Sequence, residues 1–177
     1  ATIQNVKIYG APTLTFDDGV TYFNLKDGLT ADWFTASGTD TFGEATEIQF
    51  EIEGDYAAGD IVTVIVKSVD PAGNVTSGSV ENVMVYGLPV ITYNEDKGEI
   101  SVNDVLSAEL LGATAVDSFD ESLNVSVTLS SGTIAAGNTV TLTLTATDKY
   151  GNTTVINKDF AVYGMPTISN AETLEFR

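Results

Sequence analysis

The chain contains no cysteine and no histidine among its 177 residues. Without cysteine it has neither disulfide bonds nor a thiol nucleophile, which suits an intracellular protein and a bacterial surface protein equally. Without histidine it lacks the usual general base and the usual transition-metal ligand. Ser-x-x-Lys, Gly-x-Ser-x-Gly and phosphate-loop motifs are also missing. Composition leaves open only a carboxylate pair of the glycosidase kind, and we expect a protein that is not an enzyme.

Positive charge is scarce as well. Seven Lys and Arg stand against 25 Asp and Glu, which gives a formal net charge of -18. Such a surface repels nucleic acid and anionic membranes, and its self-repulsion favours solubility. No apolar run approaches the roughly 20 residues of a membrane span, and no stretch resembles a signal peptide. The sequence therefore predicts neither a nucleic-acid partner nor membrane insertion.

The sequence does contain an internal period. The motif Tyr-Gly-x-Pro occurs three times, starting at Tyr9, Tyr86 and Tyr163, and the two spacings between these tyrosines are equal. A fixed internal period is the sequence signature of a tandem array of structural units. At 43% apolar residues, each unit is able to bury a modest core without metal or disulfide.

The period divides the chain into four segments. Two are complete repeats, and the flanking segments are a lead-in strand or the end of a preceding repeat and a tail or the start of a third one. In chain order they are 1–9, repeat 1 at 10–86, repeat 2 at 87–163, and 164–177.

The clearest strand is Thr139–Thr147, in which threonine alternates strictly with apolar residues. Such alternation predicts one buried and one solvated face. Its counterpart in repeat 1 is Ile61–Val69. We expect Lys67 to point outward and the following residues to point inward: Val62, Val64, Val66, Val140, Leu142 and Leu144.

Further strands are expected at matching places in both repeats. A returning strand leads into the motif at Val80–Tyr86 and Val155–Tyr163, and alternating strands precede the central pair at Ile48–Glu53 and Val125–Ser130. Small-residue strands run into acidic turns at Ala36–Glu44 and Ala113–Glu121. Weaker signals lie at Thr13–Phe16, Val90–Tyr93, Tyr22–Leu25 and Ile100–Val102, with helical turns as an alternative at Leu29–Phe34 and Leu106–Leu111. About seven strands per repeat predict an all-β fold of two tandem immunoglobulin-like antiparallel β-sandwiches.

One stretch resembles a known family. The segment Ala146–Thr154 followed by Phe160–Tyr163 resembles the closing strands of bacterial Ig-like repeats, and Ala113–Glu121 resembles an earlier strand of that group. Such repeats occur in tandem in large cell-surface proteins, including adhesins, internalin-like proteins and S-layer proteins. Repeat 1 departs from this pattern in Pro71-Ala72, which leaves its turn intact. The resemblance implies an extracellular location at the bacterial cell surface or envelope, and a spacer or display role.

The Tyr-Gly-x-Pro motif predicts a joint between repeats at Tyr86, Gly87 and Pro89, because no Gly/Ser-rich linker separates them. Proline fixes one φ angle, and tyrosine offers a ring for packing. We expect glycine to be the residue at which the chain turns freely. The predicted function is a non-catalytic structural spacer that forms a semi-rigid extended segment, with neighbouring Ig-like repeats of the same chain as its partners.

Calcium is the only cofactor that the sequence suggests. Acids and amides recur on corresponding turns, and hard oxygen ligands suit this ion. The candidate ligands are Asp40, Glu44, Asp70 and Asn74 in repeat 1, and Asp117, Glu121, Asp148 and Asn152 in repeat 2. The alternative is that these side chains cap their own turns. No EF-hand spacing is present.

Aromatic residues concentrate in one part of repeat 1. Tyr22, Phe23, Trp33 and Phe34 stand where repeat 2 has Glu99, Ile100, Leu110 and Leu111. An exposed aromatic patch would support an alternative function, an adhesin module that binds glycan or a host protein. The competing interpretation is that Phe23, Trp33 and Phe34 fill the core, which leaves Tyr22 as the only one at the surface.

Overall fold

The computed structural model of the chain describes residues 6–166, which fall into two compact units. The first unit takes in the described residues up to Leu88 together with the turn Asp117–Glu121, and the second takes in Pro89–Val116 and the residues from Ser122 on. The predicted segments 1–9 and 164–177 lie partly outside the described residues, and residues 6–9 form no strand. The described residues include no helix long and apolar enough to cross a membrane.

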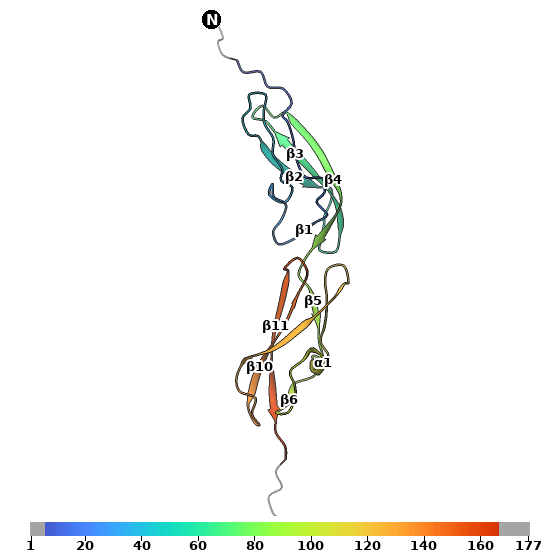
Figure 1. Cartoon of the computed structure of the whole chain (residues 1–177), viewed down its shortest axis with the longest axis vertical. Coiled ribbons are helices and arrows are strands. Elements are labelled where there is room, and N and C mark those ends of the chain that lie inside the picture. The colour runs from blue at the N-terminus through green and yellow to red at the C-terminus, as the bar shows by residue number, and fades with distance from the viewer. Residues whose placement is uncertain (1–5, 167–177) are drawn as a thin grey trace, which may run out of the picture. The chain divides into compact units, whose positions relative to one another are not determined.

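The first unit is built on a four-stranded sheet with the order β1-β4-β3-β2 (Figure 1). Its strands are β1 (Tyr22–Asn24), β2 (Glu47–Ile52), β3 (Ile61–Val69) and β4 (Val75–Tyr86). Strands β2, β3 and β4 are joined as antiparallel neighbours. Outside this sheet, isolated bridges pair Thr15 with Ser37 and Thr39 with Ala45, and they correspond to a second sheet in the other unit.

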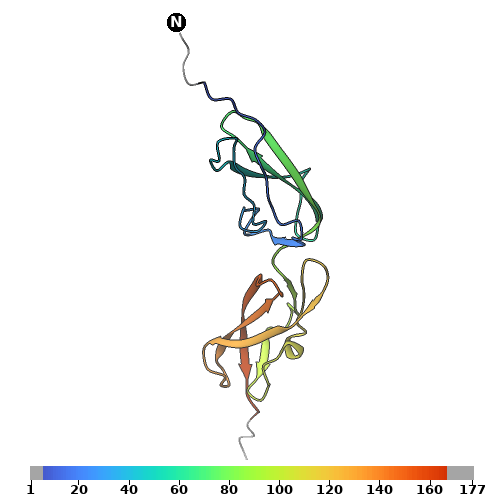
Figure 2. The same cartoon turned by 45° about the horizontal axis from the view of Figure 1, so that its top comes forward.

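The second unit contains two sheets, seen from two directions in Figures 1 and 2. One sheet has the order β6-β11-β10-β9, and the smaller one has the order β5-β7-β8. The strands are β5 (Val90–Thr92), β6 (Glu99–Ser101), β7 (Thr114–Val116), β8 (Ser122–Leu123), β9 (Val125–Ser131), β10 (Thr139–Thr147) and β11 (Thr153–Tyr163). The short helix α1 (Ala108–Leu111) is capped at its N-terminus by Ser107, whose hydroxyl accepts a hydrogen bond from Leu110 N, and at its C-terminus by Gly112.

Each unit has its own hydrophobic core. The prediction of the inward face is confirmed, because Val64, Val66, Val140, Leu142 and Leu144 are buried and Val62 is half-buried against the first core. The aromatic residues Phe23 and Phe34 are fully buried in the first core, and Trp33 packs against it. Ile100 and Leu111 are buried in the second core, where Leu110 packs against it.

The predicted strands agree best where alternation is longest. Strands β3 and β10 have the predicted bounds, whereas β4 and β11 start earlier than predicted, at Val75 and Thr153, because each hairpin pairs directly after its turn. Thr13–Phe16 forms only the bridge at Thr15. Of the two predicted helical turns, Leu106–Leu111 contains α1, but Leu29–Phe34 contains no helix.

The expectation of antiparallel pairing is wrong at one edge of each main sheet. Strand β1 runs parallel to the end of β4, and β6 runs parallel to the end of β11. Both edge strands are only three residues long. Alternation specifies which face of a strand is buried but carries no information about the direction of its partner. The described chain is thus nearly all β, in several sheets, which is consistent with a β-sandwich.

Candidate functional site

Four five-residue turns share one hydrogen-bond pattern, and they hold all eight calcium candidates. In each turn the first residue is aspartate, and its Oδ1 accepts hydrogen bonds from the amides of the third and fifth residues at 2.8–3.0 Å. The four turns are Asp40–Glu44, Asp70–Asn74, Asp117–Glu121 and Asp148–Asn152. The four aspartates are buried, at 3–6% exposure. Capping of the turn therefore occupies one oxygen of every carboxylate.

Two of these turns have a further bond, from an asparagine in their fifth position. Asn74 Nδ2 donates to Asp70 Oδ2, and Asn152 Nδ2 donates to Asp148 Oδ2, both at 2.8 Å. Burial on its own raises the pKa of the Asp70 carboxyl. The hydrogen bonds from Asn74, Ala72 and Gly73 together outweigh burial, so that the pKa of Asp70 lies below its ordinary value.

The other two turns carry a glutamate in the fifth position. Glu44 and Glu121 are exposed, so neither side chain is directed into a closed site. Asp117 Oδ2 is buried and accepts no hydrogen bond within the described part of the chain. No three acidic side chains among the described residues gather closely enough to hold a metal ion. The calcium candidates are brought together in pairs within their own turns, and calcium binding stays a prediction.

The Tyr-Gly-x-Pro segment at residues 9–12 lies against two of these turns in the first unit. Gly10 N donates to Thr41 Oγ1 at 2.8 Å, and Gly10 O accepts from Asn74 Nδ2 at 3.4 Å. Pro12 O accepts from Thr76 Oγ1 at 2.6 Å. Backbone polar groups of the motif are thus bound by side chains from two separate turns and a strand.

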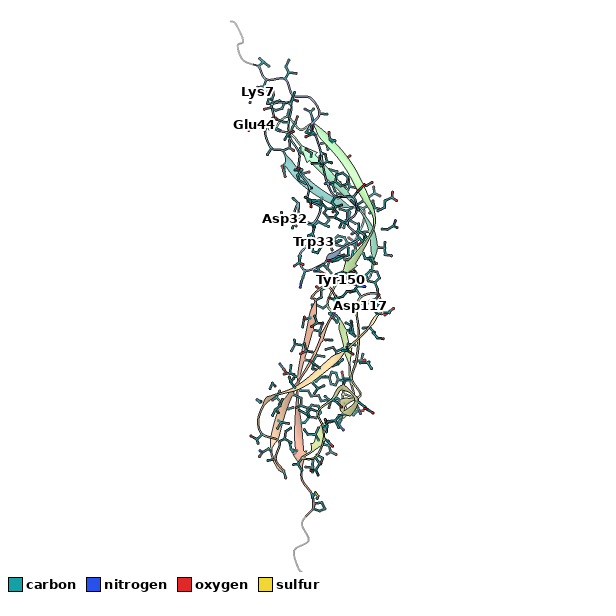
Figure 3. All side chains as sticks on the ribbon, viewed as in Figure 1. Lys7, Asp32, Trp33, Glu44, Asp117 and Tyr150 are labelled. Carbon is teal, nitrogen blue, oxygen red and sulfur yellow. The ribbon has the colours of Figure 1, made fainter. Side chains whose placement is uncertain are left out.

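Aromatic rings complete this contact. The Tyr9 and Phe42 rings meet edge to face with centroids 5.1 Å apart, and Lys7 Nζ lies 4.9 Å from the Phe42 centroid. Figure 3 labels Lys7 and Glu44 at this end of the first unit. Phe42 nevertheless remains 46% exposed. The predicted packing role of the motif tyrosine is present at Tyr9.

The second copy of the motif meets its own turn in the same way. Within the first unit, Gly87 N donates to Ser118 Oγ at 2.9 Å, and the Tyr86 and Phe119 rings have centroids 4.8 Å apart. Tyr86 is fully buried, at 1% exposure. Within the second unit, Pro89 O accepts from Thr154 Oγ1 at 2.6 Å, as Pro12 O does from Thr76. All three residues of the predicted joint are buried.

The glycine of the motif has a different role from the predicted one. Gly87 does not have a positive φ angle, so it is not a free turning point. A Cβ atom at Gly87 would lie 2.5 Å from the Cβ of Ala58, and one at Gly164 would lie 2.6 Å from the Cβ of Ala136. Glycine is needed because the Ala-Ala-Gly turn approaches the end of the last strand too closely for any side chain.

Sequence reasoning missed the residues that face the motif: Thr41 and Ser118, Phe42 and Phe119, and Ala58 and Ala136. The signal that could have found the first two pairs is the period, because the members of each pair have the same separation as successive motif tyrosines. The ring contacts and hydroxyl contacts therefore recur at the first two copies of the motif.

The aromatic cluster of repeat 1 is mostly core, as the competing interpretation expects. Phe23 and Phe34 are at 0% exposure, while Trp33 and Tyr22 are half-buried and their rings meet at 5.4 Å (Figure 3 labels Trp33). Tyr22 also approaches Tyr86, with ring centroids 6.1 Å apart.

No protein-family model matches the chain, and no curated protein matches it either.

Proposed function

We propose that the chain is a non-catalytic tandem of Ig-like β-sandwich repeats from a bacterial cell-surface protein, and that it serves as a semi-rigid extended spacer. Its partners are neighbouring repeats of the same kind. The extracellular location rests on the resemblance of segments such as Ala146–Thr154 to bacterial surface repeats. The antiparallel trios β2-β3-β4 and β9-β10-β11, each accompanied by shorter pairings in a second layer, support the Ig-like assignment.

One observation carries the proposal, namely the repeated contact between Tyr-Gly and a turn of sequence Asp-Thr-Phe or Asp-Ser-Phe. At Gly10 and at Gly87 it has the same amide-to-hydroxyl hydrogen bond and a tyrosine–phenylalanine ring contact, which is edge to face in the first case and tilted in the second. A binding or catalytic site needs polar groups that converge on a ligand. The aspartates of this chain instead bond to the backbone of their own turns. The buried carboxylates of these turns therefore stabilise the backbone of the fold.

The proposed stiffness rests on the motif itself. Gly87 and Pro89 are buried, and only one residue, Leu88, lies between them. A buried glycine held by a hydrogen bond, followed by a proline with a fixed φ angle, leaves few free torsions in the connection. A flexible Gly/Ser linker would behave as a random coil instead.

Small-angle scattering of the whole chain tests the spacer function. We expect an elongated monomer with a maximum dimension of about 70–80 Å, from two units of extended strands at roughly 3.3 Å per residue. The matched control carries a six-residue Gly/Ser insertion between Leu88 and Pro89, which should broaden the distance distribution. A compact profile, or an insertion without effect, would contradict the proposal.

The alternative function is an adhesin module that binds glycan or a host protein. The half-exposed pair of Tyr22 and Trp33 is the observation that favours it. Saturable glycan binding that is lost in both Tyr22→Ala and Trp33→Ala would support this alternative over the spacer. Because Trp33 packs against the core, the folded state of each variant is checked by circular dichroism.

Calcium stabilisation is a separate part of this alternative. An ion that binds only the folded state raises the melting temperature, and the stabilisation grows with the logarithm of the ion concentration above the dissociation constant. The test compares melting curves in millimolar calcium and in chelator, with Asp117→Asn as the variant because its Oδ2 is buried and accepts no hydrogen bond among the described residues. Identical curves for the unaltered chain would remove calcium from the proposal.

A further inference from the structure

The second unit presents a small surface at the end of its last strand. It consists of Tyr163 and Gly164 from the third copy of the motif, and Ala136 and Gly137 from the preceding turn. Tyr163 is 59% exposed, and the other three residues are exposed as well. We refer to these four residues as the end surface of the second unit.

The same arrangement exists in the first unit, at Tyr86, Gly87, Ala58 and Gly59. In both units the amide of the turn glycine donates to the last strand, Gly59 to Val85 O and Gly137 to Val162 O, both at 2.9 Å. The return bonds, Val85 N to Asp60 O and Val162 N to Asn138 O, are also 2.9 Å long. The Gly87–Ala58 and Gly164–Ala136 approaches are nearly identical, at 2.5 Å and 2.6 Å to a built Cβ. The end surface is therefore formed in the same geometry in both places.

In the first unit this arrangement is covered by the turn Asp117–Glu121. Ser118 Oγ accepts from Gly87 N, and the Phe119 ring packs on Tyr86. A Cβ atom at Gly59 would lie 2.8 Å from the carbonyl oxygen of Ser118. Tyr22 contributes to the burial of Tyr86, and its counterpart in repeat 2 is Glu99. Because repeat 2 lacks this second tyrosine, the burial of Tyr86 is not expected to be reproduced in full at Tyr163. The hydrogen bond from the glycine amide to the hydroxyl is the part of the contact that repeat 2 is able to reproduce.

A second example defines what the covering group must be. Tyr9 and Gly10 meet Phe42 and Thr41 through the same ring pair and the same amide-to-hydroxyl bond. Both covering turns begin with a buried aspartate that fixes the backbone, followed by a hydroxyl residue and a phenylalanine. The recurring partner is an Asp-Ser-Phe or Asp-Thr-Phe turn.

We propose that the end surface of the second unit is a docking site for an Asp-Ser/Thr-Phe turn of a further repeat of this kind. Gly164 N donates to the hydroxyl of that turn, and its phenylalanine ring packs on Tyr163. The proposal rests on the proposed function, since it names the partner that a tandem array supplies. Glycan is the other occupant that the test below would reveal.

The test extends the chain by one repeat. A second copy of residues 87–163 follows Tyr163 in place of 164–177, so that position 164 remains glycine, and amide hydrogen exchange is measured by NMR. We expect exchange at position 164 to slow by about tenfold relative to the unextended chain, the factor that corresponds to one hydrogen bond of ordinary strength.

Two variants of the appended copy make the test specific. Ser118→Ala in that copy removes the acceptor and should restore fast exchange, whereas Ser122→Ala changes an exposed residue of the same repeat and should not. Ser118→Ala in the original repeat, read at Gly87, gives the reference effect for a contact that the structure contains.

Unchanged exchange at position 164, with the strand amides of the appended repeat protected, would overturn the proposal. A second chain that appends residues 10–86 instead supplies a Thr41-Phe42 turn and guards against poor folding of one repeat. Failure of both appended repeats to fold would also contradict docking, since a docked turn stabilises its repeat. Saturable glycan binding to the unextended chain would reject the spacer function and leave the exchange result to decide docking independently.

Discussion

At two corresponding core positions, the first repeat has an aromatic side chain where the second has an aliphatic one. Phe34 and Leu111 occupy corresponding positions, as do Phe23 and Ile100, and all four are at 0–3% exposure. The turns differ much less, because all four aspartate turns keep the same pair of backbone bonds. These turns therefore constrain the identity of their first residue, whereas the core constrains mainly volume and apolarity.

A second difference between the two cores is a hydrogen-bonded pair of hydroxyl groups in the first one, where neighbouring residues differ as well. In the first unit, Ser68 is fully buried and its hydroxyl pairs with Thr46 Oγ1 at 2.6 Å beside Gly38. The corresponding residues of the second unit are Ala146, Leu123 and Ala115, which are apolar and have no side-chain hydrogen bond to satisfy. Where the first unit has two hydrogen-bonded hydroxyl groups beside a glycine, the second unit has two apolar side chains beside an alanine.

The largest expected effect comes from emptying each core. Phe34→Ala should destabilise the first unit by about 3–5 kcal/mol, and Leu111→Ala the second by about 2–5 kcal/mol, from lost transfer free energy and the cavity left behind. Trp33, the only tryptophan, packs against the first core and reports on it alone. Denaturant unfolding should show a shifted tryptophan transition in Phe34→Ala and an unshifted one in Leu111→Ala. A tryptophan transition that moves equally in both variants would mean that the two cores unfold as one.

The next largest effect is expected from placing a side chain at Gly38, next to the buried Ser68. A Cβ atom at Gly38 would lie 2.3 Å from Ser68 Oγ, 2.5 Å from Thr46 Oγ1 and 2.6 Å from the carbonyl oxygen of Thr13. Gly38→Ala should therefore destabilise the first unit by about 1–3 kcal/mol through overpacking. Combining it with Ser68→Ala, which imitates the second repeat, should recover part of the loss. An additive double variant in urea unfolding would show that Ser68 is not the group that resists the new methyl.

Two backbone positions carry strain in opposite repeats. Thr35 has a φ angle of 45° where repeat 2 has Gly112 at 58°, and Asp120 has 62° where repeat 1 has Gly43 at 84°. Relief of a left-handed conformation should make Thr35→Gly stabilising by about 1–2 kcal/mol, and Asp120→Gly by less, because aspartate tolerates this region better. Thermal unfolding measures both. A destabilised Thr35→Gly variant would show that its side chain contributes more than the strain removes.

The smallest effect is a dependence on pH at Asp70. Its pKa is lowered in the folded state, so its contribution to stability is complete above the unfolded value of about 3.9 and is lost as the pH falls through the folded pKa. Asp70→Asn should therefore lose less melting temperature between pH 7 and pH 3 than the unaltered chain. Asp55→Asn, at an exposed site of the same unit, controls for net charge. Equal acid sensitivity of Asp70→Asn and the unaltered chain would contradict the assignment.

The strongest predictions from sequence came from strands with long alternation. Ile61–Val69 and Thr139–Thr147 were predicted with their observed bounds, because nine residues of period two fix both the strand and its buried face. Short strands such as β1 and β6 were only approximate, since three residues hold too little pattern to set bounds or direction. At the candidate site, the sequence predicted the aspartate turns and the Tyr-Gly-x-Pro motif, but it did not predict that the motif contacts these turns.

The repeat period, the central strands and the places of the aspartate turns can all be read from the order of residues. These features are local or are read directly from the order of residues, because alternation and turn chemistry act within a short stretch of the chain. The close approach of Gly87 to Ala58, in place of free rotation, and the contact between Tyr9 and Phe42 became known from the packing of the folded chain. Those facts depend on segments far apart in the chain, whose meeting is fixed by how the sheets pack.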